Sequence, residues 1–104
     1  MAELSRAELD RMVAEATVDA YGEDEQLTGL YTLIEENLTV PFPAMVLGAQ
    51  VDVRRLELRD SDIAAVCVQG KHRQLLGLLD LEPPVPAPPG WEWVSAYRHW
   101  AGHG

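Results

Sequence analysis

Carboxylate side chains are the groups in this sequence whose number and spacing most clearly predict a chemistry. Ten of the 17 aspartates and glutamates fall in the first 37 residues with only two arginines, so this segment carries −8 of the formal net charge of −9. The densest run is DAYGEDE at residues 19–25, and a pair follows at Glu35 and Glu36. Such concentrated charge predicts either a cation site or an acidic surface that recognises a basic partner.

The helix dipole explains some of these acids and leaves others unexplained. The acids of residues 23–25 are expected in the first turn of a helix, where exposed amides and the dipole stabilise each by about 0.3–1 kcal/mol. Asp19 is expected in the last turn of the preceding helix, and Glu35 and Glu36 in the last turn of their own, where cations are preferred. Like charges held close together repel unless a proton or a cation lies among them.

Calcium is the cation that suits these groups, because it takes about six to eight oxygen ligands at roughly 2.3–2.6 Å from carboxylates, carbonyls and water. Glu35 and Glu36 lie about 18 Å farther along the second helix at a rise of ~1.5 Å per residue, so they would form a separate, weak site. A solvated helix face is the alternative for that pair. The predicted metal ligands are Asp19, Glu23, Asp24, Glu25, Glu35 and Glu36.

An EF-hand does not explain calcium binding here. Its loop needs acids at positions 1, 3 and 5, glycine at 6 and glutamate at 12, and the nearest approach, which begins at Asp60, has Lys71 in the twelfth place. We predict instead that Asp60 and Asp62 form a turn through hydrogen bonds to backbone amides.

Catalytic motifs are also missing, so we predict that the protein is not an enzyme. Cys67 lies in an apolar run, where a thiol behaves as a small buried hydrophobe. His99 and His103 have the spacing of a zinc pair, but no third ligand is evident.

Composition limits the partners and the compartment. A pI near 4.6 and only eight lysines and arginines argue against nucleic acid and anionic membranes. The sequence lacks the charged start and apolar run of a signal peptide, and no apolar stretch approaches the ~18 residues of a membrane span. We expect a cytoplasmic protein.

The N-terminal part, residues 1–39, is predicted to be an acidic helical hairpin. A capping box at Ser5 and apolar residues at helical spacing predict a first helix from about Ser5 to Tyr21. A second apolar stripe predicts a helix from about Glu23 to Asn37, with Gly29 as its weak point. A connection as short as Gly22 makes the two helices antiparallel.

The rest of the chain completes an α+β single domain over residues 1–104. Residues 40–82 change to a period of two and predict an antiparallel β meander of three or four strands, or a small barrel, with a bulge at Arg54-Arg55 and a turn at Gly70-Lys71. A proline-rich connector follows at 83–90, and a C-terminal helix at 91–104. The aromatic face of that helix, which includes Trp93, Tyr97 and Trp100, is expected to dock on the sheet.

Several of these segments together resemble one protein family. They are VDAYGEDEQ at 18–26, EN at 36–37, VPF at 40–42, VxG at 46–48 and AYRxW at 96–100. With them the chain resembles the cyanobacterial-type calcium-binding proteins called CcbP over nearly its whole length.

The resemblance implies a small soluble protein, with helices and a β-rich part, that binds calcium reversibly through surface acids and buffers free cytoplasmic calcium. It carries the ligand role to Asp19 and to the acids of 23–25, and by extension to Glu35 and Glu36. Some relatives place an acid directly after the Pro-Phe pair, where this chain has Pro43, which implies weaker binding or fewer ions. The alternative function is a non-catalytic interaction module whose acidic helices recognise a basic protein.

Overall fold

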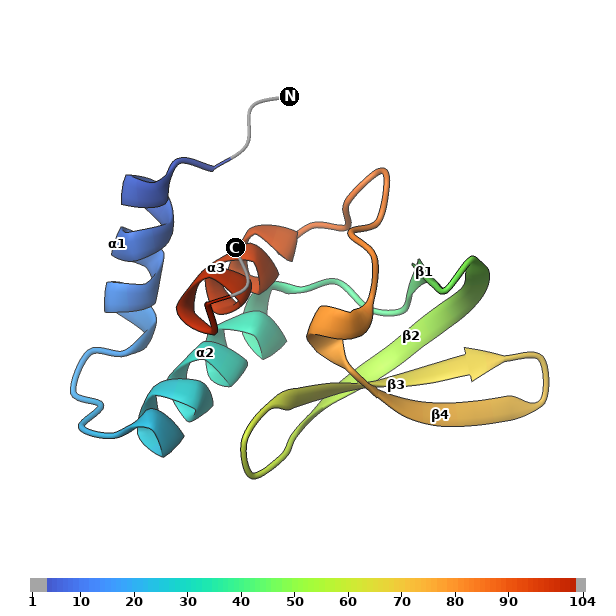
Figure 1. The fold of residues 1–104 in the computed structure, drawn as a ribbon, viewed down its shortest axis with the longest axis horizontal. Helices are drawn as coiled ribbons and strands as arrows, with labels where there is room; N and C mark the ends of the chain where they lie inside the picture. The colour runs from blue at the N-terminus through green and yellow to red at the C-terminus, as the bar shows by residue number, and fades with distance from the viewer. Residues whose placement is uncertain (1–3, 103–104) are drawn as a thin grey trace. The chain divides into compact units, whose positions relative to one another are not determined.

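The computed structural model describes residues 4–102, which form three α-helices, a short 3₁₀ helix and one four-stranded antiparallel sheet (Figure 1). The chain divides into two compact units, one made by residues 1–38 and 89–104 and the other by residues 39–88. The α-helices belong to the first unit and the sheet to the second. The predicted α+β class is therefore confirmed, while the single domain over 1–104 stays a prediction.

The helical unit contains α1 (Arg6–Ala16), α2 (Glu23–Asn37) and α3 (Trp91–Trp100). The capping box is present at the start of α1, since the Ser5 hydroxyl accepts a hydrogen bond from the Glu8 amide at 3.1 Å and the Glu8 carboxylate accepts one from the Ser5 amide at 3.3 Å. In Figure 1 the chain descends through α1 and returns upward through α2. The bounds of α2 are those predicted.

The first helix ends five residues earlier than predicted. Thr17 closes it, because both its backbone amide (2.9 Å) and its hydroxyl (2.7 Å) donate to the carbonyl of Val13. Asp19 then adopts a left-handed conformation with φ of 65°. The prediction that Asp19 lies in the last turn of the first helix is therefore wrong, and residues 17–22 form a longer connection than the Gly22 turn expected from the sequence.

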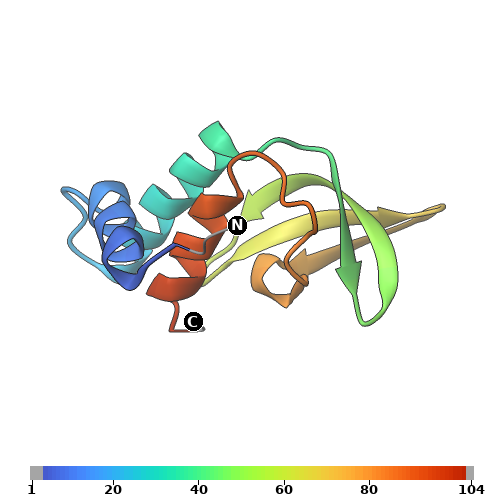
Figure 2. The same ribbon diagram turned by 90° about the horizontal axis from the view of Figure 1, so that it is seen from above.

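The third helix packs mainly on α1 and α2. Its buried side chains are Trp91, Trp93, Val94, Ala96 and Tyr97. The aromatic face predicted from the sequence is thus confirmed as a packing face, with α1 and α2 as its partners within the helical unit. Docking of this face on the sheet stays a prediction. Figure 2 shows α3 beside α1 and α2 from above.

Two glycines allow backbones of the helical unit to approach each other closely. A Cβ atom at Gly29 would lie 2.1 Å from the carbonyl oxygen of Ala16, and one at Gly90, where φ is +92°, would lie 2.1 Å from the carbonyl oxygen of Asn37. No side chain fits at such distances. Gly29 is therefore the contact point between the end of α1 and the middle of α2.

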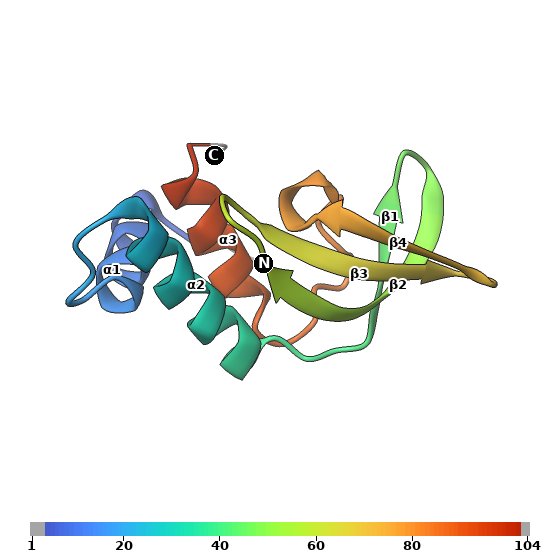
Figure 3. The ribbon, with the colours of Figure 1, turned by 90° about the horizontal axis from the view of Figure 1, so that it is seen from below.

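The sheet unit is a meander in the order β1-β2-β3-β4, made by β1 (Phe42–Val46), β2 (Ala49–Leu58), β3 (Ile63–Gln69) and β4 (His72–Gly77). The predicted bulge is confirmed, because the β2–β3 register shifts between Val53 and Arg55. The sheet is open, with β1 and β4 at the two ends of its strand order, so the barrel alternative is wrong. Figure 3 shows the four strands from below.

The last strand ends before residue 82, where the predicted β part ends. β4 ends at Gly77, and the chain turns into the 3₁₀ helix η1 (Leu78–Asp80). A Cβ atom at Gly77 would lie 2.8 Å from the Asp80 carboxylate, so the glycine leaves room for this turn, which buries Leu78 completely.

Replacing Gly29 by alanine would have two opposite effects on stability, and the sign of the net change shows which is larger. Alanine is favoured over glycine within a helix by about 0.8–1.0 kcal/mol, whereas forcing an extra carbon into a packed site costs about 1–3 kcal/mol. Because the opposing atom at Gly29 is backbone, we expect Gly29→Ala to lower the free energy of unfolding by roughly 1–2 kcal/mol in urea titrations.

Gly22→Ala is the matched control. A Cβ atom at Gly22 meets nothing within 4 Å, and φ there is −143°, so only its preference as a helix N-cap is lost. A Gly29→Ala variant more stable than the parent protein would show that α1 and α2 do not make this contact in solution.

Candidate metal site

The acidic run forms a loop and the helix turn that follows it. Residues 17–22 connect α1 to α2, and the Ala20 amide donates to the Thr17 carbonyl at 3.0 Å. Asp19 is exposed, and its left-handed backbone is one that aspartate and asparagine tolerate better than most residues. The loop thus presents the Asp19 carboxylate to solvent.

The first turn of α2 carries the next three acids. Its N-cap, Gly22, has no side chain to satisfy the exposed amides, and Glu25 contributes instead by accepting a hydrogen bond from the Tyr21 amide at 2.7 Å. The carbonyl of Asp24 accepts a hydrogen bond from the Thr28 hydroxyl at 2.9 Å. The dipole therefore stabilises this turn's negative charge even without an ion.

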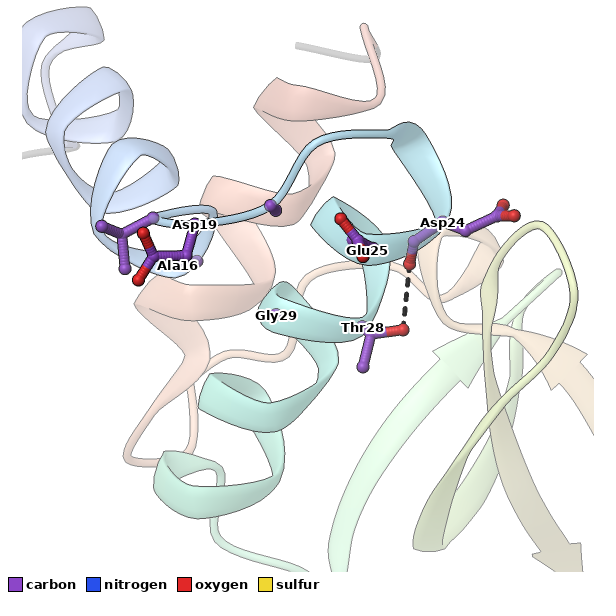
Figure 4. Close-up of a pocket in the computed structure, with 8 residues that line it drawn as sticks. Ala16, Asp19, Asp24, Glu25, Thr28 and Gly29 are labelled. Atoms are coloured by element: carbon purple, nitrogen blue, oxygen red, sulfur yellow. Dashed lines mark hydrogen bonds between the residues drawn. The ribbon is translucent and has the colours of Figure 1, made fainter.

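Asp19, Asp24 and Glu25 lie around one shallow pocket of about 380 Å³ (Figure 4). Its remaining lining residues are Ala16, Val18, Ala20, Thr28 and Gly29. The structure thus brings three of the six predicted ligands to one place. Thr28 was not among the predicted site residues, although its i, i+4 spacing from Asp24 puts both residues on one face of a helix.

The three carboxylates do not converge on one point. In Figure 4 the Asp19 carboxylate points toward the α1 side of the pocket, and the Asp24 carboxylate points out on the opposite side of α2. Within residues 4–102, no three His, Cys, Asp or Glu side chains are grouped closely enough to hold a metal ion. The pocket therefore offers oxygen donors at its rim and no preformed cage.

The other three predicted ligands lie elsewhere. Glu23 is exposed and does not line the pocket. Glu35 accepts a hydrogen bond from the Tyr31 hydroxyl at 3.0 Å, and Glu36 is exposed. Asn37 donates from its side chain to the Leu33 carbonyl at 2.7 Å, so its side chain is engaged within α2.

The two remaining metal candidates have other partners. A turn follows β2 as predicted, and the Arg59 amide closes it by donating to the Asp62 carbonyl at 2.8 Å. The Asp62 carboxylate accepts a hydrogen bond from the Arg59 guanidinium at 2.6 Å, in place of the predicted bond to a backbone amide. The His99 ring nitrogen Nε2 lies 2.7 Å from the Asp10 carboxylate, which joins α3 to α1. His103 lies outside the described residues.

A second pocket, of about 280 Å³, lies in the sheet unit and includes the chain's one thiol. Its lining residues are Val51, Cys67, Gln69, His72, Arg73 and Gln74. Cys67 is buried, and burial raises the pKa of its thiol. The thiol is therefore held in its protonated form, which is a poor nucleophile.

The fold and the acidic pocket agree with a protein family defined by calcium binding. The family model for CcbP, described as calcium binding, matches residues 10–101, which include the whole pocket. The chain therefore belongs to the CcbP family of calcium-binding proteins, and the resemblance in the sequence is confirmed. No curated protein matches the chain.

Two solved structures share this fold. The crystal structure of Anabaena CcbP is 19% identical, with a TM-score of 0.78 over 97% of this chain and 95% of that one. A calcium-binding protein in its calcium-binding form is 20% identical, with a TM-score of 0.77 over 100% of this chain and 98% of that one.

Among the residues described, no helix is long and apolar enough to cross a membrane.

The protonated state of Cys67 can be checked with a thiol-specific reagent. Because burial both shields the thiol and raises its pKa, we expect labelling at pH 8 to be at least about 100-fold slower in the native protein than in urea-unfolded protein. Equal rates would mean that Cys67 is an exposed thiol, and would reopen a catalytic role for this pocket.

Proposed function

We propose that this protein binds calcium reversibly and without catalysis through its surface acids, with the pocket of Asp19, Asp24 and Glu25 as the principal site. The main supporting observation is that three acidic residues and Thr28 line one pocket within the segment matched by a calcium-binding family. All of these polar groups are hard oxygen donors, which calcium prefers.

The open geometry supports modest affinity and fast exchange. The carboxylates of the pocket belong to exposed residues, so an ion would keep several waters, and Asp19 would have to turn toward α2 to contact it. Sites of this kind bind in the range of about 10⁻⁵ to 10⁻³ M. Such an affinity suits buffering of calcium in the cytoplasm.

Glu35 and Glu36 form the proposed second site at the far end of α2. Glu35 is already oriented by Tyr31, and Glu36 lies beside it in sequence with its side chain in solvent. Glu23 serves as an outer acid of the first site, since it precedes Asp24 in the same exposed turn. These assignments rest on the sequence pattern and the charge of α2.

The alternative function, recognition of a basic protein, is favoured by the same net charge of −8 in the first 37 residues. Ion type separates the two functions. A docking surface responds to salt in general, whereas a calcium site prefers calcium over magnesium at fixed ionic strength. Nucleic acid and membranes are not proposed as partners.

Calorimetric titration of chelator-treated protein with calcium, in physiological salt and excess magnesium, tests the principal site. We expect saturable binding that weakens at least about tenfold in Asp24→Asn and in Asp19→Asn, because each change removes a charged ligand. Stability without calcium should be unchanged or higher, since repulsion among the acids falls.

Glu15→Gln is the matched control for these variants. Glu15 is an exposed acid of α1 outside the pocket, so its loss lowers the net charge equally without removing a ligand. Heat that disappears in magnesium, or equal weakening by all three substitutions, would indicate a diffuse counterion cloud and turn attention to a basic partner.

The second site has its own test. Glu35→Gln combined with Glu36→Gln should remove one calcium equivalent from the titration and leave the tighter phase unchanged. The reason is that this pair lies about 15 Å or more along α2 from the acids of the principal site. Tyr31→Phe, which removes the hydrogen bond to Glu35, should weaken only the same phase. An unchanged stoichiometry in the double variant would assign Glu35 and Glu36 to the solvated face.

A further inference from the structure

The last turn of α3 contacts both helices that flank the acidic loop. His99 lies 2.7 Å from the Asp10 carboxylate on α1, and the Trp100 indole N–H donates to the Gln26 side-chain oxygen on α2 at 2.9 Å. The second contact joins two of the segments that carry the family resemblance, residues 18–26 and 96–100. The proposed function as described does not use Trp100.

Gln26 differs from its acidic neighbours in the first turn of α2. Its neighbours Asp24 and Glu25 are exposed and line the acidic pocket, whereas Gln26 is half-buried with its carboxamide on the indole of α3. Its backbone amide donates to the Gly22 carbonyl at 2.9 Å, which closes the turn that carries the acids. A displacement of Gln26 would therefore also move that turn.

The indole that holds Gln26 is itself firmly placed. Trp100 stacks on Tyr97 with ring centroids 6.3 Å apart and planes 27° from parallel. Tyr97 is only 3% exposed, so the stack is anchored in the interior of the helical unit. Trp100 thus presents its N–H in a fixed direction.

We propose that Trp100 is a positioning residue for the calcium site. Its hydrogen bond to Gln26 fixes the first turn of α2 to α3, and α3 is joined through His99 to α1, the helix that leads into the loop with Asp19. The bond thereby sets how far the carboxylates must move to share an ion. This inference rests on the proposed function. It predicts that ion binding alters the environment of the indole, and that loss of the hydrogen bond weakens binding although neither residue is a ligand.

The test is a double-mutant cycle on calcium affinity. Trp100→Phe removes the donor and keeps an aromatic ring, and Gln26→Met removes the acceptor and keeps a long unbranched side chain. We expect each to raise the calcium Kd about three- to tenfold, and the double variant to raise it no further, because all three lack the same hydrogen bond.

The calcium-dependent shift of tryptophan emission is a second measurement. If Trp100 only stabilised the fold, calcium would not change the emission of its indole. Calcium should shift the emission of the parent protein and of Trp93→Phe, whose indole is buried in the same helix, and should not shift that of Trp100→Phe. Urea unfolding without calcium measures the structural contribution separately.

The outcomes distinguish this inference from the function on which it rests. If the parent protein binds calcium and both single variants bind it equally well, Trp100 is not a positioning residue and the proposed function stands. Additive effects, or losses of affinity that follow losses of stability, also overturn the inference. If the parent protein does not bind calcium, the proposed function itself fails.

Discussion

The close contact between the carbonyl of Ala16 and the helix at Gly29 is the constraint on which the acidic pocket depends. It places the end of α1 against the middle of α2, so the connecting residues 17–22 must return along α2 to reach its first turn. Both Ala16 and Gly29 consequently line the pocket. A side chain at Gly29 would move the loop, and with it Asp19, away from the acids of α2.

Repulsion among the carboxylates and the dipole of α2 together determine how the acids of the pocket are arranged. Acids at the start of α2 are stabilised by the dipole, so they cost little in the ion-free protein, and Asp19 reduces its repulsion by pointing away from Asp24. In the proposed function, calcium would reverse that balance by supplying the attraction that draws the carboxylates together.

The sequence predicts the parts that depend on local chemistry. The capping box at Ser5, the bounds of α2 and the bulge before Arg55 all follow from neighbouring residues. The end of α1 was missed because the Thr17 hydroxyl competes for a helix carbonyl. Apolar periodicity showed which face of α3 is buried without showing its partner. The acids were evident, but the direction of the Asp19 carboxylate depends on the left-handed backbone at that residue.

That backbone conformation also bears on how the family can diversify. With φ of 65°, position 19 accepts asparagine and glycine nearly as well as aspartate, while branched residues are strained there. One substitution, to asparagine, would keep the loop and delete its charge. On the proposed function, folding and ion affinity are thus separable at this position, so a lineage could weaken calcium binding at the principal site through a single change and retain an intact protein free to acquire another role.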